Sequence, residues 1–173
     1  MFLLWSLMTE LFSTRALQSF SILLTWYGDL WNQFVMIFIL CQQAPGKIAP
    51  VNGTVARSVL QNVLSYVSTE VHPNIGGLFN PSATEDVKTY IRGNAAKKLT
   101  YLNDTLIGTK QFVVGDSFTV ADSYLYIVLS WTAYVGIDLT PYPNVKKYFE
   151  FIGSQENVKA AHARMATSPA TTF

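Results

Sequence analysis

The feature that most constrains the fold is the run 117–122, Ser-Phe-Thr-Val-Ala-Asp, which stands just before the apolar stretch 124–135. A helix leaves its first backbone N–H groups without intrahelical partners. Thr119 and Asp122 have the spacing of a capping box, in which each side chain accepts from the backbone N–H of the other residue. The following residues, to about 134, are apolar on nearly every face. The pattern therefore predicts a helix through the middle of a domain. Water cannot reach the first N–H groups of such a helix, so the two side chains of the capping box must supply their hydrogen bonds.

Two amphipathic helices are predicted before this segment. Valines at four-residue spacing mark the first, which should end near His72 because the residue before a proline disfavours helical conformation. A capping box from Ser82 to Glu85 predicts the start of the second, and Gly108 is placed to end it. The stripe of the first helix is Val55, Val59, Val63 and Val67, and that of the second is Val87, Ile91, Ala95, Leu99, Leu102 and Leu106.

Two further helices are predicted after the capping box and its helix. Pro143 opens one that runs through Phe151, since proline is tolerated in the first turn of a helix. The pair Gly153-Ser154 separates it from a last helix over about 155–165. Residues 167–173 carry no pattern and are predicted to be a disordered tail. No strand pair is predicted, so the expected fold class is all-α, a helical bundle.

Composition excludes several classes of protein. The 173 residues carry a formal net charge of +1, which gives no electrostatic signal for a nucleic-acid partner. Cys41 is the single cysteine, so an internal disulfide and a multi-cysteine metal site are excluded. The two histidines, His72 and His162, lack ligand spacing, and no metal site is predicted.

Residues 1–43 contain fewer charged residues and more large apolar residues than the rest of the chain. The only charged residues up to position 56 are Glu10, Arg15, Asp29 and Lys47. The uncharged runs 16–28 and 30–44 are shorter than the roughly 20 residues of a membrane span. Three interpretations stay open: membrane association, helices that cover the following domain, or sequence that is not native protein. Residues 44–53 hold two prolines and are predicted to be a linker to a domain over 54–166.

Several motifs together resemble one protein family. The approach Phe-Val-Val-Gly-Asp at 112–116 and the Thr-x-x-Asp box resemble the start of the central helix in the C-terminal domain of soluble glutathione S-transferases. The segments 48–54, 64–72, 78–81, 130–139 and 143–161 are similar, in the same order, to the bacterial beta class. The resemblance spans about residues 44–166. It implies a helical bundle of the glutathione S-transferase C-terminal type, here with extra apolar N-terminal helices.

The resemblance also implies a chemistry that this chain carries only in part. Enzymes of the family bind glutathione with a thioredoxin-like N-terminal domain, which holds the catalytic Ser, Tyr or Cys. The residues before position 44 show no strand–helix–strand alternation, and Cys41 stands just before the linker and not at the start of a first strand. The thioredoxin-like domain is therefore predicted to be missing or replaced, and nothing identifiable activates the thiol.

The candidate site residues also come from the resemblance. In beta-class enzymes the first long helix of this domain contacts glutathione, and the matching residues here are Ser65, Thr69, Glu70, Val71 and His72. His72 is the candidate catalytic residue, although a histidine that closes a helix explains it equally well. The candidates for the electrophile pocket are Tyr124, Trp131 and Tyr134, although aromatic side chains on a buried helix more often belong to the core.

The expected function is a glutathione S-transferase family protein that transfers glutathione to small electrophiles, incomplete as a catalyst in this chain. Glutathione is expected as co-substrate, with no permanently bound cofactor, and the family implies a cytoplasmic homodimer. Two alternatives remain: a non-catalytic helical binding or dimerisation module, and a membrane-associated variant that uses residues 1–43.

Overall fold

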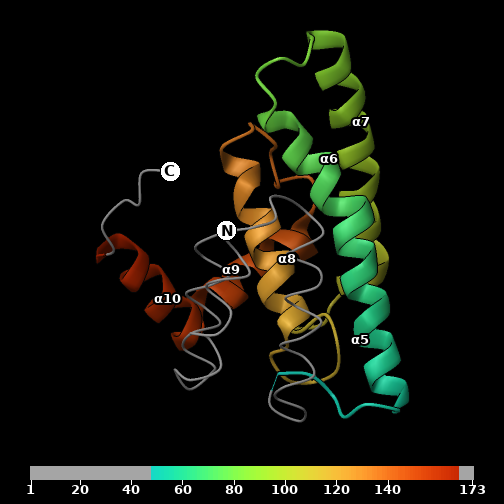
Figure 1. The fold of residues 1–173 in the computed structure, drawn as a ribbon, viewed down its shortest axis with the longest axis vertical. Helices are drawn as coiled ribbons and strands as arrows, with labels where there is room; N and C mark the ends of the chain where they lie inside the picture. Colours follow the sequence, from blue (N-terminus) through green and yellow to red (C-terminus); the bar gives the residue numbers. More distant parts are fainter. Residues whose placement is uncertain (1–47, 168–173) are drawn as a thin grey trace, which may run out of the picture.

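The computed structural model describes residues 48–167, with side chains to residue 163, and these residues form a bundle of helices without a strand (Figure 1). The segment 1–43, residues 44–47 of the predicted linker and residues 168–173 of the predicted tail lie outside the described residues. The helices are α5 (Val55–Tyr66), α6 (His72–Gly76), α7 (Glu85–Tyr101), α8 (Val120–Ser130), α9 (Pro143–Ser154) and α10 (Glu156–Thr167). The predicted all-α fold is confirmed.

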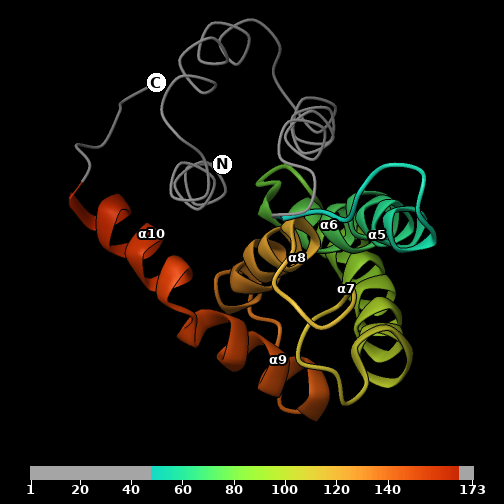
Figure 2. The same ribbon diagram turned by 90° about the horizontal axis from the view of Figure 1, so that it is seen from below.

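Helix α8 is the centre of the bundle. Every residue from Val120 to Leu129 is buried, as the apolar run predicts. Helices α5 and α6 pack on one side of α8 and α9 on another. Helix α7 packs against α6, and α10 continues from α9 along the outside (Figure 2). Burying one large apolar side chain stabilises a fold by about 1.5–3 kcal/mol. The central helix therefore contributes a large share of the core.

The start of α8 is fixed by one buried carboxylate. Thr119 and Asp122 form the capping box, and the side chain of Asp122 is 0% exposed. Its Oδ2 accepts from the backbone N–H and the hydroxyl of Thr119, both at 2.8 Å. Its Oδ1 accepts from the backbone N–H of Val113 at 2.8 Å and from the hydroxyl of Tyr148 at 2.9 Å. Asp122 therefore joins the loop before α8 and the helix α9 to the central helix.

The prediction that the first helix ends near His72 is wrong. Helix α5 passes into a π-helical turn at Val67–Val71, and α6 continues from His72 in helical conformation. The N–H of His72 bonds to the carbonyl of Val67, five residues earlier. Proline lacks an N–H and its ring clashes with the carbonyl four residues before it in a regular helix. The wider turn lets the chain pass Pro73 without a break, and such π-bulges recur at functional sites.

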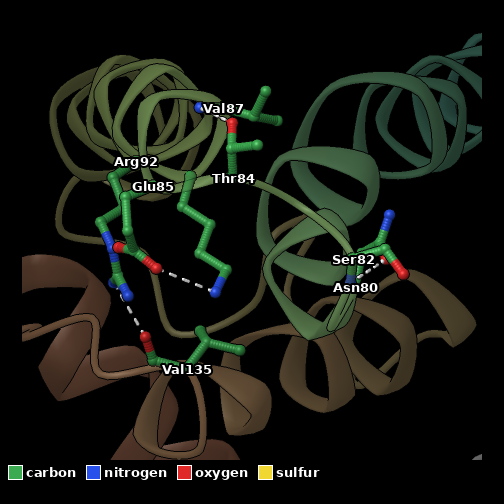
Figure 3. Close-up of polar contacts among 8 residues, drawn as sticks. Asn80, Ser82, Thr84, Glu85, Val87, Arg92 and Val135 are labelled. Atoms are coloured by element: carbon green, nitrogen blue, oxygen red, sulfur yellow. Dashed lines mark hydrogen bonds and ion pairs between the residues drawn. The ribbon is translucent and has the colours of Figure 1, made fainter.

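The start of α7 also differs from the sequence prediction. Thr84 is the N-cap, and its hydroxyl accepts from the N–H of Val87 (Figure 3). The N–H of Ser82 instead bonds to the side chain of Asn80 at 2.9 Å, in a turn before the helix (Figure 3). The box predicted from Ser82 to Glu85 is therefore wrong, because a local side-chain turn competes for the same backbone group.

The other helix limits lie close to the predictions. A π-helical turn at Leu102–Ile107 extends α7, and Gly108 with φ 52° ends it as predicted. Helix α8 ends at Ser130, a turn earlier than expected, and a 3₁₀ turn follows at Trp131–Ala133. The two predicted apolar stripes enter the core only in part, because Val55, Val59 and Val87 are 82%, 46% and 46% exposed.

Candidate functional site

An open groove of about 420 Å³ lies where α6 meets the end of α8. One wall comes from α6 and the 3₁₀ turn Gly77–Phe79, and the other from the turn that begins at Trp131. The lining residues are His72, Pro73, Gly76, Gly77, Phe79 and Trp131. The groove combines a titratable imidazole with aromatic walls, which is the composition of many small-molecule sites.

His72 lines this groove, and its ring is held on two sides. The side chain is 8% exposed, and Nδ1 lies 2.8 Å from the hydroxyl of Tyr124. The ring meets the indole of Trp131 edge to face, with 4.8 Å between centroids and an interplanar angle of 84°. Burial lowers the pKa of His72 from 6.5 to about 4. The imidazole is therefore neutral at physiological pH.

Gly76 keeps the groove open beside this ring. A Cβ atom at Gly76 would lie 3.4 Å from Cδ2 of His72 and 3.4 Å from Cζ3 of Trp131. A methyl group at this position would just reach van der Waals contact with both rings, so any longer side chain would enter the space beside the imidazole. The glycine therefore leaves one edge of the His72 ring accessible.

Arg92 fixes the far wall of the groove to the bundle. Its guanidinium donates to the carbonyl of Val135 at 2.8 Å, across 43 residues of sequence (Figure 3). Val135 belongs to the loop that follows Trp131, and the N–H of Val135 bonds to the carbonyl of Trp131 at 3.1 Å. This contact anchors the backbone that follows Trp131 to α7, and a charged donor makes it one of the stronger hydrogen bonds.

The predicted glutathione-binding residues are spread along one helical segment. Ser65 and Thr69 are exposed, and the Thr69 hydroxyl donates to the carbonyl of Ser65 at 2.9 Å. Glu70 is half-buried and forms an ion pair of 2.6 Å with Lys98 of α7. The side chain of Val71 points into the core, with 1% exposed. Only His72 of this set lines the groove.

The three predicted pocket aromatics occupy different environments. Trp131 lines the groove, Tyr124 is 2% exposed behind His72, and Tyr134 is 81% exposed outside the lining residues. Sequence reasoning missed Phe79. This residue is 50% exposed, and its ring meets that of Trp131 edge to face with 5.9 Å between the ring centroids. Its signal was available: a large aromatic residue directly before the helix-breaking pair Asn80-Pro81.

A second groove, of about 330 Å³, lies near the first described residues. Its lining comes from residues 48–50, α5 and the loop before α8, and it holds no titratable side chain. Within residues 48–167, no group of three or more His, Cys, Asp or Glu side chains could hold a metal ion. Over the same range, no helix has the length and apolar character needed to cross a membrane.

Comparison with known families identifies the domain. Residues 70–163 match the family model described as glutathione S-transferase, C-terminal domain. The chain is 32% identical over 137 residues to the glutathione S-transferase GstA of Escherichia coli O157:H7. That alignment covers 78% of this chain and 67% of the relative. The chain therefore spans about two thirds of the length of this relative.

Solved structures give the same result. A sphingomonad glutathione S-transferase complexed with glutathione superimposes with a TM-score of 0.71 at 31% identity, covering 79% of this chain and 68% of that one. The bacterial beta-class enzyme of Sphingomonas chungbukensis superimposes with a TM-score of 0.70 at 30% identity, covering 78% and 67%. The similarity thus extends from the sequence motifs to the arrangement of the helices.

Proposed function

This chain belongs to the glutathione S-transferase family, and we propose that the groove beside His72 receives the sulfur end of glutathione. The observation that carries the proposal is a neutral, buried imidazole with one accessible edge between aromatic walls. An N–H donor in such a site stabilises a thiolate, because preorganised donors act strongly where water is excluded. Glutathione complexed with a sphingomonad relative supports this choice of ligand.

The helical segment that leads to His72 would hold the rest of the tripeptide. Ser65 and Thr69 supply exposed hydroxyl groups on the approach to the groove, and Glu70 supplies a carboxylate. Val71 can contribute only its backbone, since its side chain lies in the core. Trp131 and Phe79 would then contact an apolar electrophile at the open end of the groove.

We propose that the chain binds glutathione and transfers it to electrophiles slowly. A thiol with a pKa near 8.5 must lose its proton before it attacks. A neutral imidazole donor lowers that pKa less than a cation does. His72 is the one titratable group among the residues that line the groove.

Calorimetric titration of the full chain with glutathione tests the proposal. His72→Gln should weaken binding by about tenfold, which corresponds to a lost hydrogen bond to a charged group. His162→Gln is the matched control, because His162 bonds to Tyr126 and lies outside the groove. S-methylglutathione has no thiolate and should be less sensitive to His72→Gln. Failure of the wild-type chain to bind glutathione would refute the proposal.

A homodimer is the proposed assembly. Three apolar side chains share one face of α7, because their spacing is close to whole helical turns. Val87, Tyr90 and Tyr101 are 46%, 71% and 42% exposed. Exposed apolar side chains on one helix face favour contact with a partner surface. Tyr90→Ser should shift the sedimentation coefficient toward the monomer, and a wild-type chain that is monomeric at high concentration would contradict the assignment.

A further inference from the structure

We propose that Tyr124 is a positioning residue that fixes the tautomer of His72, so that the imidazole presents Nε2–H to the groove. The inference rests on the proposed function for its catalytic meaning, but its geometry stands alone. Tyr124 lies on α8 and His72 on α6, 52 residues apart in sequence, and their side chains meet in a buried hydrogen bond of 2.8 Å.

The direction of this hydrogen bond follows from the partners of the phenol. Burial raises the pKa of Tyr124 above its ordinary value, so the hydroxyl keeps its proton. The bond to His72 is the single hydrogen bond of that hydroxyl within residues 48–167. If Nδ1 were the donor, the buried O–H of Tyr124 would have no acceptor, at a cost of about 1–3 kcal/mol. The hydroxyl therefore donates and Nδ1 accepts.

The second nitrogen of the ring must then carry the proton. In a neutral imidazole one nitrogen donates and the other accepts, so acceptance at Nδ1 leaves the hydrogen on Nε2. Nε2 forms no hydrogen bond within the described residues and is not among the buried atoms that lack a partner. It lies 3.7 Å from the position of a Cβ on Gly76, which lines the groove. The N–H is thus accessible from the groove.

The surrounding side chains keep the ring from turning over. A flip of the imidazole would exchange Nδ1 for a carbon atom opposite the Tyr124 hydroxyl. The edge-to-face contact with Trp131 fixes the plane of the ring, and Tyr124 itself meets the ring at 5.8 Å between centroids. In the proposed function this donor is aimed at the sulfur of glutathione. Tyr124 therefore acts through His72 and does not line the groove.

Nitrogen-15 NMR of the histidine side chains in the full chain tests the tautomer without any ligand. At pH 7.5 we expect His72 to show an unprotonated Nδ1 and a protonated Nε2 in one state. Tyr124→Phe removes only the hydroxyl, and His72 should then exchange between both tautomers. Glutathione should bind this variant about fivefold more weakly, the equivalent of one neutral hydrogen bond.

Tyr126→Phe is the matched control on the same helix. Its hydroxyl pairs with Nε2 of the other histidine, His162, at 2.9 Å. This variant should change the spectrum of His162 and leave that of His72 as in the wild type. Circular dichroism and thermal melting of both variants establish that they fold.

Two outcomes would overturn the assignment. One is a wild-type His72 that carries its proton on Nδ1, a result that needs no variant to fold. The other is a single unchanged tautomer in a folded Tyr124→Phe protein. Failure of the wild type to bind glutathione would instead refute the proposed function and leave the tautomer result standing.

Discussion

Removal of the Asp122 carboxylate should destabilise this protein more than a typical lost helix cap. An exposed cap costs about 0.5–2 kcal/mol when it is replaced by alanine. Asp122 is 0% exposed, and its two oxygens accept four hydrogen bonds. Asp122→Ala therefore leaves two backbone N–H groups and two hydroxyl groups without this acceptor, away from water.

The magnitude can be worked from these donors. A buried donor left without a partner costs about 1–3 kcal/mol, and the hydroxyls of Thr119 and Tyr148 can turn toward other acceptors. The two N–H groups, of Val113 and Thr119, cannot turn. We therefore expect a loss of about 3–5 kcal/mol in the free energy of unfolding. For a domain of this size that loss lowers the melting temperature by about 12–20 °C.

Urea and thermal unfolding followed by circular dichroism measure this loss. Asp138→Ala is the matched control, because Asp138 also accepts from a backbone N–H, that of Thr140, but is exposed. The control should shift the melting temperature far less. Equal shifts for the two variants would show that burial adds nothing to the cap, and the argument from unsatisfied donors would fail.

Three further outcomes are expected. Because burial lowers the pKa of His72 from 6.5 to about 4, the unfolded chain binds the extra proton first, so stability should fall as pH drops from 6.5 to 4. With solvent screening at the open groove, the free energy of unfolding should fall by about 1–2 kcal/mol. Urea unfolding of His72→Gln between these pH values should not show this dependence on pH. Turnover of a general electrophile with glutathione should be far below that of the Escherichia coli relative, and comparable turnover would contradict the proposed slow transfer. Deletion of residues 1–43, which lie outside the described residues, should cause aggregation if they cover an apolar face, and a soluble truncated chain of unchanged melting temperature would exclude that interpretation.

Much of the fold could be predicted because it depends on local sequence. The capping residues Thr119 and Asp122, the apolar run behind them and the stop at Gly108 act over a few residues, within one or two helical turns. Local signals failed where two of them competed, as at Pro73, where a π-helical turn carries the helix past the proline. They also failed at Ser82, whose N–H is taken by Asn80.

The candidate site was predicted in its members but not in its arrangement. The family, the central helix and the candidacy of His72 and Trp131 follow from the amino-acid sequence, since each of these depends on motifs that are continuous in the chain. The packing of the helices is what places Tyr124 behind His72, Phe79 against Trp131 and Tyr134 outside the groove. The physical reason is that these contacts join residues about fifty positions apart. Their pairing depends on how α6 and the end of α8 pack against each other, which no local pattern encodes.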